Sequence, residues 1–176
     1  MDFDDFLDPY RPLWDELEVL RALFDPAHPE RTIAQFTPVF RNLYEDDRDD
    51  LYADDQPDDL AGRVGRFLDR VRHLSTAVPT QEELDQAPTL HRWCGARLGC
   101  SPFLLGYVTG HPILRWGARA HTSVLLQVSP HLGWARTWNR FYVLGELTPA
   151  TLFSFQADGK IPPAVELIRF DEHWLQ

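Results

Sequence analysis

The sequence predicts an α+β protein in which N-terminal helices are followed by a small antiparallel sheet that could close into a barrel. Apolar residues recur at helical spacing up to about residue 75, and β-branched and aromatic residues alternate with polar ones after about residue 90. Separate helical and strand regions favour α+β over alternating α/β. We expect an acidic helical region at 1–59 and a helix-plus-sheet domain at 60–176, or one compact unit containing both.

Two helical stretches are predicted in the first region. Apolar residues recur at helical spacing over 13–24, after Pro12, whose missing N–H costs little in a first helical turn. Asp25-Pro26 should end this helix. The second stretch covers 33–44, and Pro38 should break or restart it because proline cannot donate the helical hydrogen bond.

A dense acidic run follows at 45–59, where nine of the fifteen residues are Asp or Glu. Like charges at this density repel one another, so the run predicts a solvated loop or linker. The next apolar stripe predicts an amphipathic helix at about 58–75. Thr80 and Glu83 then form a capping-box pattern, which predicts a short helix ending before Pro88.

Strands are predicted in the last part of the chain. The turn residues at 129–133 indicate a hairpin, and Asp158-Gly159 indicates another turn. The candidate strands lie near 103–109, 121–128, 134–144 and 163–170, with a weaker one near 151–155.

Charge is divided unevenly along the chain. Residues 1–60 hold 18 acidic residues against 5 Arg, whereas the whole chain has a net charge of −10. Such a surface repels nucleic acid and anionic membranes and attracts basic proteins, so we expect no direct nucleic-acid binding and no membrane contact. A solubilising helical face and a DNA mimic are the alternatives. The candidate partner-binding residues are Asp46, Asp47, Asp49, Asp50, Asp54 and Asp55.

The cysteine content and the first 30 residues suggest a cytoplasmic protein. Two cysteines are too few for a disulfide scaffold, and no secretory signal or membrane-spanning run is visible. We expect no metal and no cofactor. Zinc is a weaker alternative, since thiolates and imidazoles suit it, and its ligands would be His91, Cys94, Cys100 and His111.

A hydrolytic site would use Ser123 with His111 or His121 and an acidic residue. His111 lies in a Gly-His-Pro turn, which would hold an imidazole rigidly for proton transfer near neutral pH, or would simply form the turn. Ser123 lacks the G-x-S-x-G nucleophile pattern, and no acidic residue lies between Asp85 and Glu146. An enzyme is therefore the less favoured class.

A ligand face is predicted on the strand at 134–144. Side chains alternate along a strand, so every second residue faces the same way. Two guanidinium groups framed by two aromatic rings could hold an anion, a nucleotide base or a carboxylate, or form an ordinary solvated face with Arg stacked on Trp. The residues of this face are Arg136, Trp138, Arg140 and Tyr142.

Four short motifs follow one another along the second half of the chain. They are the pattern P-T-x-x-x-L-x-x-A-P-x-L-x-x-W at 79–93, V-x-G-H-P at 108–112, T-S-x-L at 122–125 and G-W-A-R-T-x-x-R-x-Y-x-L-G at 133–145. In this order they resemble an uncharacterised bacterial domain-of-unknown-function family over about residues 63–145. The resemblance implies little about the activity of the chain. The chain departs from the family pattern in its acidic N-terminal region, its C-terminal tail and Arg115-Trp116, which replaces a smaller polar turn.

Together these observations favour a non-enzymatic protein-interaction module whose acidic surface docks a basic partner. An accessory or inhibitor of a nucleic-acid-processing machine is the sharpest form of this hypothesis, because such machines are basic. The alternative is a small ligand-binding or hydrolytic domain with a site around His111, Arg136, Arg140 and Tyr142. The oligomeric state is left open.

Overall fold

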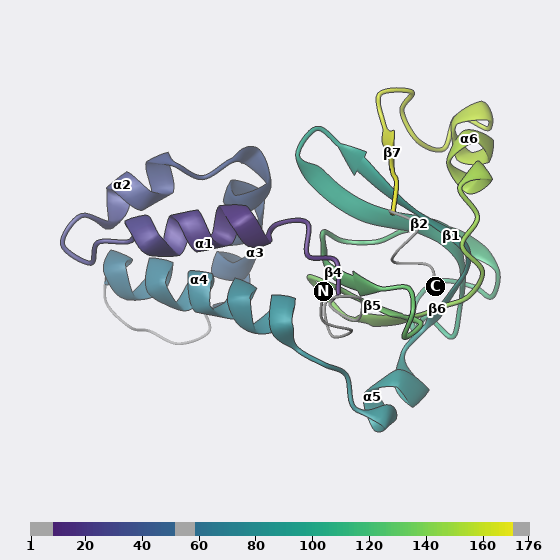
Figure 1. Ribbon diagram of the computed structural model, residues 1–176, viewed down its shortest axis with the longest axis horizontal. Coiled ribbons are helices and arrows are strands. Elements are labelled where there is room, and N and C mark those ends of the chain that lie inside the picture. Colours follow the sequence, from purple (N-terminus) through teal and green to yellow (C-terminus); the bar gives the residue numbers. More distant parts are fainter. Residues whose placement is uncertain (1–8, 52–58, 171–176) are drawn as a thin grey trace, which may run out of the picture. The chain divides into compact units, whose positions relative to one another are not determined.

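The structure, a computed structural model, describes residues 9–51 and 59–170 (Figure 1). The chain divides into two compact units. The helical unit is Leu13–Ser75, and the sheet unit combines Met1–Pro12 with Thr76–Gln176. The α+β class is confirmed. The grouping differs from the expected 1–59 and 60–176, because the helix after the acidic run belongs with the N-terminal helices.

The described residues of the helical unit form four helices (Figure 1). Prolines stand at the first positions of the second and third, where a missing N–H costs little, as expected for Pro38. The helices are α1 (Trp14–Leu23), α2 (Pro29–Ala34), α3 (Pro38–Leu51) and α4 (Leu60–Thr76).

The core of the helical unit is aromatic. The ring of Phe67 on α4 lies 5.7 Å from that of Phe36, 6.2 Å from that of Phe40 and 5.2 Å from that of Tyr44, measured between centroids. Tilted and edge-on rings at these separations attract one another beyond their buried area. The predicted apolar stripe of α4 is thus its packing face.

Helix α3 continues into the acidic run, so the prediction of a loop from residue 45 is wrong for 45–51. Asp47 is buried, and its Oδ1 accepts a hydrogen bond of 2.5 Å from Nη1 of Arg70 on α4. Asp47 follows Leu43 by one helical turn and thus continues the buried face. This ion pair offsets the weak helix propensity of aspartate. Residues 52–58 lie outside the described part of the chain.

The sheet unit contains two short helices and seven strands among the described residues (Figure 1). The strand order is β3-β2-β1-β6-β5-β4, with β7 paired to β1. The elements are α5 (Gln81–Gln86), β1 (Thr89–Leu98), β2 (Ser101–Thr109), β3 (Ala118–His121), β4 (Leu125–Ser129), β5 (Trp134–Thr137), β6 (Phe141–Leu144), α6 (Ala150–Ala157) and β7 (Glu166–Ile168).

Several sequence predictions for this unit need correction. The candidate strand at 121–128 is divided between β3 and β4, and that at 134–144 is two strands, β5 and β6. Strand β1 was not predicted. The weak strand at 151–155 is wrong, because these residues belong to helix α6, whose Leu152 and Phe155 are buried three residues apart. The capping box of α5 and the hairpin at 129–133 are confirmed.

The sheet is open and mixed, whereas an antiparallel, barrel-like sheet was expected. Thr89 and Leu90 of β1 pair in parallel with β6, while Gly95, Ala96 and Arg97 pair antiparallel with β7. Between these halves the register shifts, and Arg92 adopts a φ of 45°, a left-handed conformation uncommon for a residue with a side chain. This bulge bends β1, so its two halves pair with different strands.

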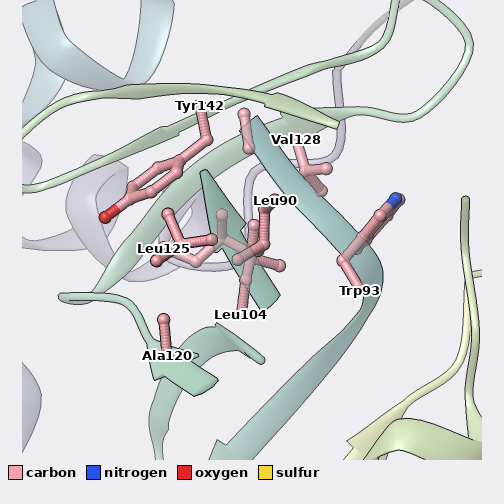
Figure 2. Packing of buried hydrophobic residues seen from close by; sticks show 9 residues of the cluster. Leu90, Trp93, Leu104, Ala120, Leu125, Val128 and Tyr142 are labelled. Atoms are coloured by element: carbon pink, nitrogen blue, oxygen red, sulfur yellow. The ribbon is translucent and has the colours of Figure 1, made fainter. Parts of the chain in front are cut away.

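Both faces of the β1–β2 hairpin are buried. Leu104 and Leu105 are neighbours on β2 and therefore point to opposite faces. Leu105 packs with α6 residues Leu152 and Phe155. Figure 2 shows the other cluster, in which Leu104 lies among the side chains of Leu90 and Leu125, with the ring of Tyr142 alongside. This packing provides a rigid base for the loops at the strand ends.

Candidate functional site

The loop between β2 and β3 exposes several large apolar side chains. We call residues 111–117 the Trp116 loop. Glycines with left-handed φ angles flank it, Gly110 at 70° and Gly117 at 73°. The Gly117 N–H donates a 2.8 Å hydrogen bond to the Val108 carbonyl, and this bond closes the base of the loop.

His111 holds the loop from inside. Its Nδ1 accepts hydrogen bonds from the backbone N–H groups of Ile113 and Leu114, both at 3.2 Å. An accepting Nδ1 requires a neutral imidazole protonated on Nε2. Partial burial and, secondarily, the nearby charge of Arg140 lower the pKa of His111, which favours this neutral form. The candidate catalytic imidazole is therefore a structural part of its own turn.

The loop exposes large apolar side chains. Ile113 is 84% exposed and Trp116 is 81% exposed, and Leu114 and Arg115 are also exposed. Single exposed apolar residues are ordinary, but several in one loop often mark an interaction site. Trp and Arg are enriched among the residues that contribute most to protein–protein binding.

Ser123, the candidate nucleophile, also holds structure together. Its Oγ donates to Oγ1 of Thr137 at 3.0 Å and accepts from the Asn139 N–H at 3.2 Å. Beside it, the Thr122 hydroxyl accepts from the Leu104 N–H at 3.0 Å and donates to the Ser123 carbonyl at 2.8 Å. These hydroxyls connect the irregular segment between β3 and β4 to β2, to β5 and to the turn after β5.

The prediction that four side chains of 134–144 share one face is wrong. Residues 138–140 separate two antiparallel strands rather than continue one. Across this pair Ala135 is opposite Tyr142 and Arg136 is opposite Phe141, and opposite residues share a face. Arg136 and Tyr142 therefore lie on opposite faces. The Arg136 guanidinium stacks 4.7 Å from the Phe141 ring centroid.

Part of the predicted site nevertheless comes together. The charge of Arg140 acts on both His111 and Tyr142, although burial is the main cause of the raised pKa of Tyr142. Trp138 is buried, and its backbone N–H donates a hydrogen bond of 2.8 Å to the Val124 carbonyl. Arg140 thus lies near His111 of the Trp116 loop, whereas the Trp138 side chain is buried.

The four zinc-ligand candidates are not brought together. Cys100 precedes β2 and His111 follows it, and a nine-residue strand is about 25 Å long. Burial raises the pKa of the Cys94 thiol to about 11, so the thiol stays protonated at neutral pH. His91 Nε2 lies 2.9 Å from the Thr109 hydroxyl oxygen. Among the described residues, no three His, Cys, Asp or Glu side chains form a metal-binding group.

The candidate acidic surface is only partly described. Asp46 is exposed, whereas the carboxylate of Asp47 is buried against Arg70. Asp47 is therefore not part of the predicted docking surface. The backbones of Asp49 and Asp50 belong to α3. Asp54 and Asp55 lie outside the described residues.

Ile113 and Trp116 were not among the predicted site residues. Their signal was present, because an apolar run and a tryptophan occupied a turn between two strands, where polar residues are usual. Arg115-Trp116 also departed from the resembled family pattern at that point.

Comparison with known proteins identifies one family. The model of the family described as "Family of unknown function (DUF6634)" matches residues 62–157, more than half of the chain. This match confirms the resemblance to a domain of unknown function. No curated protein and no solved structure matches the chain significantly. Within the described residues, none of the helices has the length and apolar character needed to cross a membrane.

Proposed function

The chain belongs to the DUF6634 family, and, because the function of this family is unknown, we propose from its geometry that it is a non-enzymatic protein-interaction module. The observation that carries the proposal is the Trp116 loop, which exposes Ile113 and Trp116 on a closed, hydrogen-bonded frame. A contact surface that is already ordered loses little conformational entropy on binding.

The use of the candidate catalytic groups supports the same proposal. A nucleophilic hydroxyl needs a neighbouring base to accept its proton. The hydroxyl of Ser123 instead bonds to Thr137, and Nδ1 of His111 accepts two backbone N–H groups. These contacts make a structural role the simpler explanation for both residues.

The acidic helices would form a second contact. On the exposed side of α3, Glu45 and Asp46 would attract a basic partner, and a nucleic-acid-processing machine in the bacterial cytoplasm is the proposed source of such a partner. This contact would serve an accessory or inhibitory role. The test is a double charge reversal, Glu45→Lys with Asp46→Lys, which should abolish a salt-sensitive interaction.

The test of the main contact is affinity capture from a lysate of the source organism with matched variants. Trp116→Ala combined with Ile113→Ser should lose a protein that the unaltered chain retains. Phe153→Ser is the control, since Phe153 is 62% exposed on α6 of the same unit. Equal capture by both variants would overturn the proposal that the Trp116 loop is the contact.

A further inference from the structure

The Trp116 loop lies in a long stretch of sequence that has no acidic residue. Between Asp85 and Glu146 the chain has six Arg and no Asp or Glu, although its net charge is −10. The loop lies in this basic stretch and contributes Arg115 to it. A partner that covers the loop must therefore accommodate positive charge as well as apolar side chains.

Two of the arginines already have carboxylate partners. Arg97 donates to Glu166 with a closest distance of 2.8 Å, and Arg119 forms an ion pair with Asp158. In contrast, neither Arg115 nor Arg140 forms an ion pair with any residue that the structure describes. Both belong to the loop or its immediate electrostatic surroundings.

We infer that the Trp116 loop binds an acidic protein surface, in which carboxylates surround an apolar pocket that receives Ile113 and Trp116. The inference rests on the proposed function and adds the chemical class of the partner. Covering Arg115 without a carboxylate would leave a desolvated charge unpaired, which is costly. A guanidinium matches a carboxylate through two parallel hydrogen bonds.

Other anionic partners fit these observations less well. Nucleic-acid affinity depends on many phosphate contacts, whereas at the Trp116 loop only Arg115 and the nearby Arg140 lack an ion pair with any described residue. Trp116 offers one aromatic plane for stacking on a base, but Ile113, which is as exposed, offers none. An anionic membrane is an extended negative surface that would also face the rest of the chain, whose net charge is −10, whereas an acidic protein patch needs to face only the Trp116 loop.

The test is site-specific photo-crosslinking in living cells, with p-benzoylphenylalanine replacing Ile113 in one variant and Phe153 in the control. The cross-linked segments are sequenced by mass spectrometry. The inference expects protein segments that contain more Asp and Glu than Lys and Arg, captured at position 113 and not at position 153.

A charge variant makes the test quantitative. Arg115→Gln should lower the cross-linking yield at position 113 about thirtyfold or more, as expected for removal of one partner from a buried charge pair. Arg97→Gln is the matched control, because Arg97 is already paired with Glu166, and it should leave the yield unchanged. Circular dichroism of both variants checks that they fold.

The outcomes separate the inference from the proposed function. Specific capture of neutral or basic protein segments, or an unchanged yield for Arg115→Gln, would overturn the acidic partner while the interaction module remained. Capture of nucleic acid or of lipid would also overturn it. No capture at position 113 above the control would overturn the proposed function together with the inference.

Discussion

The Asp47–Arg70 pair in the helical unit and the Trp116 loop in the sheet unit reverse the usual places of polar and apolar side chains. The Asp47 side chain is only 3% exposed, although it lies in the most acidic run of the sequence. Ile113 and Trp116 are among the most exposed side chains of the chain, although they are large and apolar.

The difference shows how burial separates structural from functional residues. A charge is buried only where a partner compensates it, so Asp47 serves the packing of α3 against α4. Exposing a large apolar side chain to water is unfavourable in free energy. Where a loop nevertheless exposes such side chains together, they indicate a role outside the folding of the chain. The four predictions below test this comparison, from the largest expected effect to the smallest.

The largest effect is expected for Arg70→Ala. The substitution removes the Arg70 guanidinium from the buried Asp47 carboxylate and should destabilise the helical unit by about 3 kcal/mol, at the lower end of the usual range because Arg70 is 37% exposed. Amide hydrogen exchange of α3 and α4 measures this loss. Asp46→Ala, at the exposed neighbouring residue, should change the stability of the helical unit by less than about 0.5 kcal/mol. Equal effects of both variants would contradict a structural role for the pair.

Two glycine substitutions should have opposite signs in the two units. Gly117→Ala should destabilise the sheet unit by about 1 kcal/mol, because a φ of 73° strains any residue with a Cβ. Gly65→Ala in α4 should stabilise the helical unit by about 0.5 kcal/mol, since its Cβ would meet Phe24 at an ordinary 3.4 Å.

Urea unfolding distinguishes the two glycine variants. Tryptophan fluorescence follows mainly the sheet unit, since every tryptophan except Trp14 belongs to it, and hydrogen exchange follows α4. A Gly117→Ala variant as stable as the unaltered chain would show that the loop base is not rigid.

The Trp116 loop should loosen in acid. The pKa of His111 is lowered from its usual 6.5, so the neutral imidazole stabilises the folded loop above that pH, and this contribution is lost as the pH falls through the folded-state pKa. Protonated Nδ1 cannot accept from Ile113 and Leu114. Their amide protection factors, measured by NMR, should fall accordingly. His111→Asn, which retains an acceptor without a titrating ring, should remove this pH dependence.

The smallest stability effect is expected for Trp116→Ala. Because the side chain is 81% exposed, its removal should change the free energy of unfolding by less than about 0.5 kcal/mol. Thermal unfolding measures the change. The same variant should lose the proposed partner, so a large loss of stability would assign Trp116 to the fold rather than to binding.

Particular residues show why the candidate site was only partly predictable. Gly-His-Pro correctly marked a turn, but the hydrogen bonds of His111 Nδ1 depend on loop geometry that motifs do not contain. Arg136 and Tyr142 were assigned to one face because the turn at 138–140 was missed. Each missed turn reverses the alternation of side chains that follow it.

The sequence by itself determined the segregation of helices and strands, the amphipathic α4, the capping box of α5 and the hairpin at 129–133. These features arise from local periodicity and from residues a few positions apart. Only the tertiary structure decided that Asp47 is buried, that β1 bends to pair with β6 and β7, and that the Trp116 loop stays exposed. Asp47 and Arg70 are 23 residues apart. Burial depends on such distant partners, which a local pattern does not specify.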